Sequence, residues 1–249
     1  MKNKIFSSGD YYDLFYEDKD YQLEANYIHK KIQEYKLNAY SILELGCGTG
    51  KHAINLTKFG YKILGIEKSD SMLNKTIKAK NLEFQKGDIR EIKLKNTYDC
   101  VISLFHVMSY QITNESLISV FRTAFNNLKK DGIFLFDFWF APAVIHQKPS
   151  VRTKTVSSKN NTICRIAEPE LLVEKNQVKV KYTFHDFDHS NNKFKITNEL
   201  HQMRYFSIPE LEFIANKTGF KLLNAEEFLT GLKPSFNTWG VCIIFRKNG

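Results

Sequence analysis

A run of closely spaced glycines follows a short apolar segment. The sequence Ile42-Leu-Glu-Leu-Gly-Cys-Gly-Thr-Gly50 predicts a buried strand, a tight turn and then a helix. Gly46, Gly48 and Gly50 let the backbone approach a ligand, because side chains there would block it. The spacing differs from the G-x-G-x-x-G pattern that cradles a dinucleotide pyrophosphate. Glu44 precedes the turn on a strand expected to be buried, so its carboxylate needs a partner, and a ligand with positive charge would supply one.

Acidic side chains follow the next two predicted strands. The second strand ends at Gly65-Ile-Glu67, where a carboxylate can accept hydrogen bonds from both hydroxyls of a ribose. After the third strand comes Gly87-Asp-Ile-Arg90, in which Asp88 can accept from an adenine amino group while Ile89 covers the ring. Open parallel sheets bind ligands at the carboxyl ends of their strands, and the fourth strand ends there with Ser103-Leu-Phe-His106. The sequence therefore predicts a nucleoside site at this edge.

Short apolar strands alternate with helices through the first half of the chain. The strands are predicted at 41–45, 62–66, 82–85, 100–105 and 133–138. The helices between them are predicted at 51–59, 70–78 and 114–128. This alternation is typical of an α/β fold whose parallel sheet is covered on both faces.

The pattern changes after residue 138. Alternating apolar and polar positions predict antiparallel strands within 152–205, including 162–167, 171–174, 178–186 and 194–205. A helix capped by Ser207 and a closing strand pair follow. Four parts are predicted. A leader helix and lid span residues 1–40, and a ligand-binding core spans 41–138. An antiparallel β insertion spans 139–206, and a C-terminal helix with the closing strand pair spans 207–249.

Composition narrows the class of protein. The chain has 36 Lys and Arg against 27 Asp and Glu, a net charge of +9, but the basic residues are scattered rather than gathered in a nucleic-acid-binding run. The four cysteines lie far apart without a C-x-x-C pair, so neither a zinc site nor a disulfide framework is predicted. The longest apolar runs are about half of the roughly 20 residues that a membrane helix needs. We expect a cytoplasmic protein without a metal and without membrane insertion.

The four motifs, taken in their order along the chain, resemble the motifs with which class I methyltransferases bind S-adenosylmethionine (SAM). These enzymes convert SAM to S-adenosylhomocysteine. The motifs are E-L-G-C-G-T-G, G-I-E, G-D-I-R and S-L-F-H. The resemblance implies a doubly wound, Rossmann-like seven-stranded sheet, with the antiparallel insertion after strand five. In that family the glycine loop holds the methionine part of SAM, the strand-two acid holds the ribose and the G-D pair holds the adenine. Carried over by position, these contacts fall on Gly46, Gly48, Glu67, Asp88 and Ile89, with Leu104 and Phe105 beside the cofactor.

A narrower resemblance covers most of the chain. The leader Tyr12-Asp-Leu-Phe-Tyr16 with Lys19-Asp-Tyr21, the segment Asp137-Phe-Trp-Phe-Ala-Pro142 and the insertion look like N-methyltransferases that act on nucleotide-linked aminosugars. Leader tyrosines close over SAM in those enzymes, which implies that Tyr16 and Tyr21 contact it.

The class of acceptor molecule is inferred from this resemblance and from a further one. The segment Pro234-Ser-Phe-Asn-Thr-Trp239 looks more like methyltransferases of surface-polysaccharide clusters. We therefore expect transfer to an amino or hydroxyl group of a sugar, either nucleotide-linked or destined for a surface glycan. The alternatives are an RNA methyltransferase, for which only the basic charge balance speaks, and a methyltransferase of another small amine or alcohol. The motifs leave the methylated atom and the oligomeric state open.

Three side chains are candidates for a general base: Tyr16, His106 and His201. An amine acceptor must arrive deprotonated or lose a proton, and a hydroxyl depends still more on a base. For His106 a catalytic role and a role in lining the pocket are equally open. His201 and Arg204 fall on opposite faces of a predicted strand, and we expect one of them at the surface.

Overall fold

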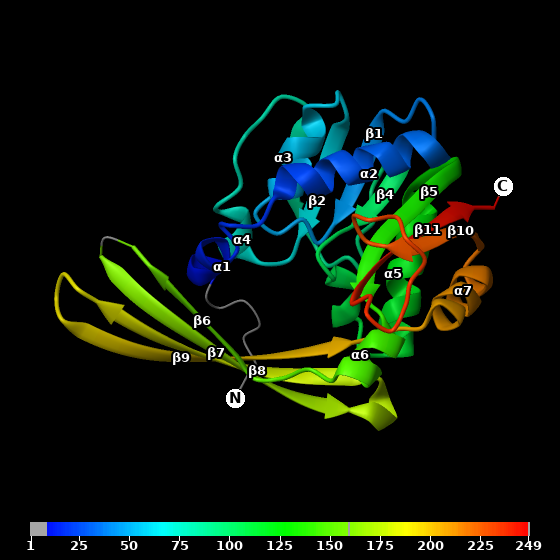
Figure 1. Ribbon diagram of the computed structural model, residues 1–249. Coiled ribbons are helices and arrows are strands. Elements are labelled where there is room, and N and C mark those ends of the chain that lie inside the picture. Colours follow the sequence, from blue (N-terminus) through cyan, green and yellow to red (C-terminus); the bar gives the residue numbers. More distant parts are fainter. Residues whose placement is uncertain (1–8, 159, 249) are drawn as a thin grey trace.

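A seven-stranded sheet forms the centre of the computed structural model, which describes residues 9–158 and 160–248 (Figure 1). Its strands are β1 (Ser41–Leu45), β2 (Lys62–Glu67), β3 (Leu82–Lys86), β4 (Tyr98–Ser103), β5 (Leu128–Trp139), β10 (Phe220–Glu227) and β11 (Gly240–Lys247). They lie in the order β10-β11-β5-β4-β1-β2-β3. The five strands β5, β4, β1, β2 and β3 run parallel. The strand β11 pairs antiparallel with both β5 and β10. The predicted doubly wound sheet is confirmed.

Helices cover both faces of this sheet. The helices α2 (Tyr21–Tyr35) and α3 (Lys51–Thr57) pack on one face, and α5 (Asn114–Asn127) and α7 (Ile208–Lys217) pack on the other. Side chains close the first turns of two of them, since Thr113 and Ser207 each form a capping box. Three short helices are α1 (Gly9–Phe15), α4 (Asp70–Leu73) and α6 (Ala141–Gln147), and two 3₁₀ turns are η1 (Val107–Tyr110) and η2 (Val173–Lys175).

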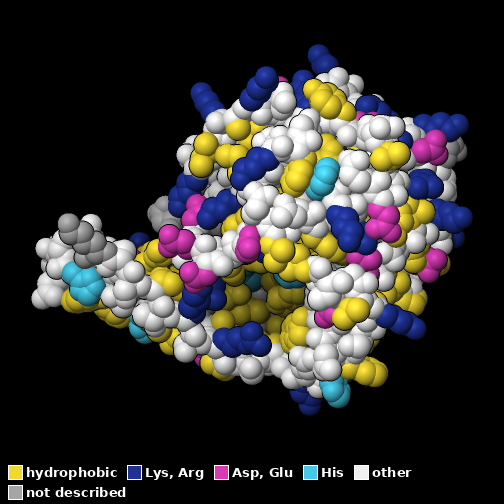
Figure 2. Space-filling view, turned by 45° about the horizontal axis from the view of Figure 1, so that its top comes forward, with side chains coloured by type: hydrophobic (Ala, Val, Ile, Leu, Met, Phe, Trp, Pro, Cys, Tyr) yellow, Lys and Arg dark blue, Asp and Glu magenta, His cyan; other side chains and the backbone are white. Residues whose placement is uncertain are grey.

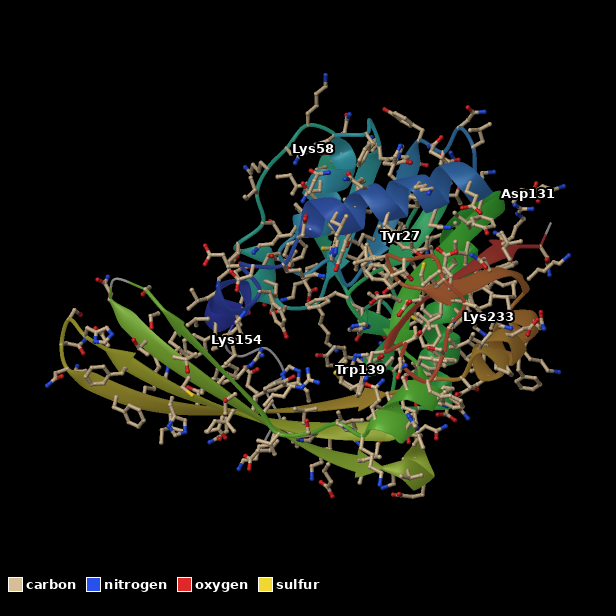
Figure 3. The ribbon with its side chains drawn as sticks, in the orientation of Figure 1. Tyr27, Lys58, Asp131, Trp139, Lys154 and Lys233 are labelled. Carbon is tan, nitrogen blue, oxygen red and sulfur yellow. The ribbon has the colours of Figure 1, made fainter. Side chains whose placement is uncertain are left out.

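The insertion forms a second, antiparallel sheet. Its strands are β6 (Arg152–Ser157), β7 (Asn161–Leu172), β8 (Gln177–Asp188) and β9 (Lys193–Arg204), in that spatial order. The sheet extends below the core and beyond it, and α1 lies against its upper face (Figure 1). Phe15 packs against Ile163 and Phe184, and Lys154 donates from Nζ to the Phe15 carbonyl at 2.8 Å (Figure 3). The leader thereby connects the core to the insertion.

Two predicted elements differ from the structure. The helix expected at 70–78 ends at Leu73, and only Met72 of this helix is buried. Beyond it, the amides of Lys75 and Thr76 donate to carbonyls three residues back, at 3.0 and 3.1 Å, rather than four residues back as in an α-helix. The strand expected at 171–174 is the end of β7 followed by η2, because Asn176 adopts a left-handed conformation that turns the chain into β8. None of the helices within the described ranges is long and apolar enough to cross a membrane.

Candidate active site

A cavity of about 820 Å³ lies between the carboxyl edge of the large sheet and the inner face of the insertion. The space-filling view shows it as a hollow with a mainly hydrophobic interior (Figure 2). The core, the leader and the insertion all contribute to its wall. Of the twelve predicted site residues, the cavity wall includes Tyr16, Tyr21, Gly46, Gly48, Glu67, Asp88, Ile89, Leu104, Phe105, His106 and His201. Glu44 is the exception.

The glycine loop is held by backbone hydrogen bonds. The amides of Gly46 and Cys47 both donate to the carbonyl of Ile66, at 2.8 and 3.0 Å. Gly46 has a φ of +77°, and a Cβ atom there would lie 2.6 Å from Val107 Cγ1. Gly48 has a φ of +56°, but a Cβ atom on it would meet nothing within 4 Å. The loop is therefore packed tightly at Gly46 and open to the cavity at Gly48.

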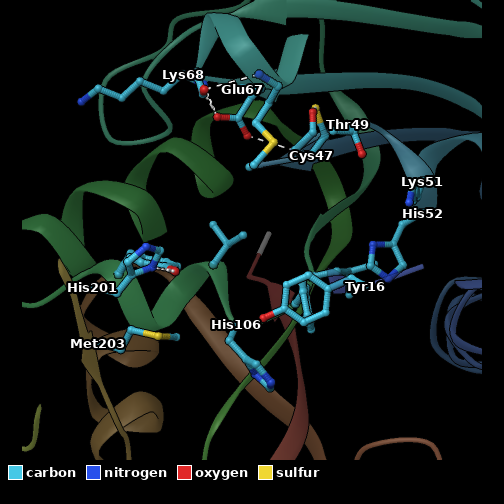
Figure 4. A pocket seen from close by; sticks show the side chains of 18 of the residues that line it. Tyr16, Cys47, Thr49, Lys51, His52, Glu67, Lys68, His106, His201 and Met203 are labelled. Carbon is cyan, nitrogen blue, oxygen red and sulfur yellow. Dashed lines mark hydrogen bonds between the residues drawn. The ribbon is translucent and has the colours of Figure 1, made fainter. Parts of the chain in front are cut away.

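The carboxylate of Glu67 is fixed by three backbone amides. Its Oε2 accepts from Gly48 at 2.9 Å, and its Oε1 accepts from Lys68 and Ser69, each at 2.8 Å (Figure 4). A carboxylate has about four acceptor sites, so three are occupied and Oε2 can still accept from a ligand. The end of β2 is thus prepared to accept a hydrogen bond from a hydroxyl group of a ligand.

Glu44 lies behind the cavity wall. Its side chain is 1% exposed, and among the described residues Oε2 has no hydrogen-bond partner. Burial raises the pKa of Glu44 to about 8, and the nearby charge of Glu67 adds to the increase. A cation bound nearby would favour the carboxylate form of Glu44, and the sulfonium and ammonium groups of SAM are such cations.

Asp88 is already paired with two cations. Its carboxylate accepts from Lys68 Nζ at 2.8 Å and from Arg90 Nε at 2.8 Å. The hydrogen bond from Arg90 is the main cause of a pKa of Asp88 well below its usual range, so this side chain is a carboxylate. Its neighbour Ile89 also lines the cavity.

His106 and Asp137 form a close pair across two adjacent strands. His106 follows β4 with a left-handed φ of +61°, and Asp137 lies near the end of β5. Nδ1 of His106 is 2.8 Å from Oδ2 of Asp137, and the His106 amide also donates to this carboxylate. Burial would raise the pKa of Asp137, but the His106 contacts lower it below its usual range. The Nδ1 side of the imidazole therefore lies against the Asp137 carboxylate, and the ring also lines the cavity.

Two leader tyrosines contribute rings to the wall. The ring of Tyr16 stands edge-on to Phe105 with centroids 5.0 Å apart, and Tyr21 stands edge-on to His52 at the same distance. In the close-up view, Tyr16 and His106 lie on one side of the cavity and His201 on the other (Figure 4).

His201 and Arg204 are both buried, at 5% and 9% exposure, so the expected surface position for one of them is wrong. His201 faces the cavity, where Nδ1 is 2.9 Å from the Tyr110 hydroxyl and Nε2 is 3.1 Å from Glu199 Oε2. Arg204 points to the other face and pairs with Glu210. The core packs against that second face, which is why both positions lose contact with solvent.

The polar residues of the wall that sequence reasoning missed include Tyr110, Arg165, Tyr182 and Glu199. Glu199 could have been found, because period-2 spacing puts it on the same face as His201. Tyr110 gave no signal, since it lies in a 3₁₀ turn without periodicity. Within the described residues, no group of three or more His, Cys, Asp or Glu side chains is arranged to hold a metal ion.

The fold and the site define a doubly wound α/β protein with a glycine-rich ligand loop at the carboxyl edge of its sheet. Residues 42–132 match the family model described as "Methyltransferase domain". A methyltransferase of Clostridium acetobutylicum, described as SAM-dependent, has a similar fold, with a TM-score of 0.81, 20% identity and coverage of 96% of this chain and 97% of that one. Residues 42–132 are therefore a methyltransferase domain, and the whole chain has the fold of a SAM-dependent methyltransferase, in agreement with the class and the cofactor predicted from the sequence.

Two further proteins are similar over nearly the whole chain. The dTDP-3-amino-3,4,6-trideoxy-alpha-D-glucopyranose N,N-dimethyltransferase of Streptomyces venezuelae is 26% identical over 226 residues, which cover 90% of this chain and 92% of that protein. The crystal structure of the sugar N-methyltransferase KedS8 from a Streptoalloteichus species has a TM-score of 0.82 and 18% identity, and the match covers 100% of this chain and 95% of that one. The similarity therefore includes the insertion and the leader as well as the core.

Proposed function

We propose that this enzyme transfers a methyl group from SAM to the amino group of a nucleotide-linked sugar. The observation that carries the proposal is that one cavity joins the glycine loop to the inner face of the insertion. The similarity to an aminosugar dimethyltransferase over 90% of the chain supports it, because the insertion lies within the matched length.

The cofactor would be held by the carboxyl edge of the large sheet. Gly46 and Gly48 leave room for its methionine part, while Glu67 accepts a hydrogen bond from its ribose. Asp88 and Ile89 face its adenine, and Leu104 and Phe105 lie beside it. Glu44 stabilises its positive charge from behind the loop, and Tyr16 and Tyr21 cover it from the leader. When bound, SAM supplies an electrophilic methyl group on a sulfonium.

The insertion, for which we propose the bounds 139–206, forms the roof of the acceptor site. Trp139, Tyr182 and Phe184 give this part of the wall flat apolar surfaces that suit a sugar ring. Trp139 lies where the core meets the insertion (Figure 3). Arg165 adds a positive charge within the cavity, which suits the phosphates of a nucleotide-linked acceptor.

Catalysis would combine alignment of the acceptor with removal of its proton. Holding an acceptor in line with the methyl group converts an encounter between two molecules into a step within one complex. His106, anchored by Asp137, and the Tyr16 hydroxyl are placed to orient the acceptor's amino group. His201 approaches from the insertion and is the proposed proton acceptor.

The alternative acceptor, RNA, is less favoured. The lysines and arginines on the visible face in Figure 2 are spread over the surface and do not form one continuous stripe. A role in building surface polysaccharides and a place in the cytoplasm complete the proposal; the free state of all four cysteines supports the second of these.

A screen of acceptors tests the function. Purified enzyme with SAM is offered dTDP-linked 3-amino and 4-amino sugars, the matching hydroxy sugars and a structured RNA, and mass spectrometry measures the added methyl groups. We expect saturable methylation of an amino sugar, without RNA and with little dependence on salt. Methylation of RNA alone, with a steep salt dependence of binding, would refute the proposal.

A further inference from the structure

A chain of three polar side chains runs from the cavity into the insertion. The hydroxyl of Tyr110 lies 2.9 Å from Nδ1 of His201, and Nε2 of the same imidazole lies 3.1 Å from Oε2 of Glu199. All three residues line the cavity, and His201 and Glu199 are only 5% and 6% exposed. Tyr110 belongs to η1 of the core, whereas the other two belong to β9 of the insertion.

The direction of these hydrogen bonds follows from their chemistry. A carboxylate only accepts, so the imidazole nitrogen that faces Glu199, Nε2, carries a hydrogen. In neutral imidazole the other nitrogen, Nδ1, then has a free lone pair and accepts from the Tyr110 hydroxyl. A phenolic oxygen that donates its hydrogen can also accept a hydrogen bond, and Tyr110 lines the cavity in which a ligand would bind.

The neighbouring phenols do not act as bases by themselves. Burial raises the pKa of Tyr110 well above its usual range, with further increases from Tyr182, Tyr16 and Glu199. Burial likewise raises the pKa of Tyr182, whose ring stands edge-on to His201 at 4.9 Å, to about 12. The guanidinium of Arg165 lies over the Tyr182 ring, 5.4 Å from its centroid. Of these groups, the imidazole of His201 is the one with a carboxylate, that of Glu199, at 3.1 Å to pair with a positive charge.

We propose that Tyr110, His201 and Glu199 form a relay that removes the proton of the acceptor's ammonium group. This inference rests on the proposed function, and it adds Tyr110 as a catalytic residue and Glu199 as a positioning residue. The ammonium gives one proton to the Tyr110 oxygen while Tyr110 gives its own proton to His201 Nδ1. The products are a neutral amine with a free lone pair and an imidazolium paired with the Glu199 carboxylate. The imidazolium later returns its extra proton to solvent.

The relay predicts a loss of activity that depends on pH. Turnover of a dTDP-linked 3-amino-deoxyglucose is measured from pH 6 to 9.5 for wild type, Tyr110→Phe, His201→Gln and Glu199→Gln. We expect His201→Gln to lower kcat about 100-fold at pH 7, within the range for a general base, and only about fivefold or less at pH 9.5, where the amine arrives deprotonated. SAM affinity should change less than about twofold, since none of the three touches the glycine loop. A loss of equal size at every pH, or no loss, would overturn the relay.

Tyr205→Phe is the matched control. Its hydroxyl is buried without a hydrogen-bond partner among the described residues, and Tyr205 is absent from the cavity wall. This variant should keep wild-type turnover at every pH. If His201→Gln unfolds, Tyr110→Phe decides the question, because it removes a single oxygen atom.

A second measurement does not require turnover. Nitrogen-15 NMR of the histidine rings should find His201 with its hydrogen on Nε2, and Tyr110→Phe should shift the Nδ1 resonance. A hydrogen on Nδ1 in the neutral ring would overturn the relay even in an active enzyme. If the wild-type enzyme methylates no sugar but the NMR result holds, the proposed acceptor is wrong and the hydrogen-bonded chain stands.

Discussion

The amide of Gly48 donates a hydrogen bond of 2.9 Å to the carboxylate of Glu67, 19 residues further along the chain. The bond joins the glycine loop to the end of β2 and fixes the carboxylate at the cavity wall. Two motifs that the sequence presents separately therefore act as one ligand-binding unit.

Replacing Glu67 tests this unit. Glu67→Ala should weaken SAM binding by about 1 to 3 kcal/mol, the usual cost of leaving polar groups unpaired. Isothermal titration calorimetry measures the affinity, and Glu83→Ala on the exposed side of β3 serves as control. Unchanged SAM affinity in Glu67→Ala would contradict the assignment.

The pair of His106 and Asp137 predicts a separation of turnover from cofactor binding. His106→Ala and Asp137→Asn should each lower kcat about tenfold or more, because the imidazole is lost or no longer anchored at Nδ1. The SAM dissociation constant should stay within about twofold. If stopped-flow and steady-state assays find wild-type turnover in both variants, His106 is only part of the wall.

Glu44 should make stability depend on pH. The folded protein binds the proton with a pKa of about 8, whereas an unfolded glutamate has a value near 4.5, so stability falls as pH rises through this window. Glu44→Gln removes that effect and should raise the free energy of unfolding by about 4 kcal/mol at pH 8 but not at pH 4. Urea titrations at both pH values measure it. An equal change at both would show that the carboxyl is not protonated in the folded state.

The same carboxyl group should couple SAM binding to proton release. A bound cation favours the carboxylate form of Glu44, so binding at pH 7 should release a proton. Calorimetry in buffers of different ionisation enthalpy detects the proton. If the Glu44→Gln variant still releases a proton when SAM binds, the proton comes from another titratable group.

The two loop glycines should respond differently to alanine. Gly46→Ala places Cβ 2.6 Å from Val107 in a left-handed conformation and should cost about 2 to 3 kcal/mol of folding stability. Gly48→Ala meets open space, so it should cost only about 1 kcal/mol for its backbone conformation, while it weakens SAM binding. Urea unfolding with calorimetry separates the two effects, and equal stabilities for the two variants would contradict this description of the loop.

Asp99 should contribute to stability against acid. It accepts from the amide and hydroxyl of Ser41 at 2.9 and 2.7 Å and from Lys129 Nζ at 2.9 Å. Burial raises its pKa, but these hydrogen bonds outweigh burial and lower it to about 2. The stabilisation is therefore present above about pH 4 and is lost as pH falls toward 2. Asp99→Asn should lower the free energy of unfolding by about 2 kcal/mol at pH 7 and by much less at pH 2, as urea titrations can show.

The sequence by itself determined the class of fold and the edge of the sheet at which a ligand binds. Both depend on local patterns, since the glycine spacing fixes a backbone turn and the alternation of strands and helices fixes a parallel sheet. The short α4 and the turn η2 escaped prediction because a tighter hydrogen-bonded turn ends α4 and a left-handed asparagine ends η2, and neither shows in the periodicity of apolar residues.

Only the tertiary structure decided which side chains meet. Asp137 reaches His106 across 31 residues because β4 and β5 are neighbours, and Tyr110 reaches His201 across 91 because the insertion folds back on the core. The tertiary structure also places Glu44 behind the cavity wall and buries both faces of the end of β9. A pattern of apolar and polar residues states which face of a strand is covered, but it does not specify what covers it, and that partner determines the charge, burial and proton chemistry of the site.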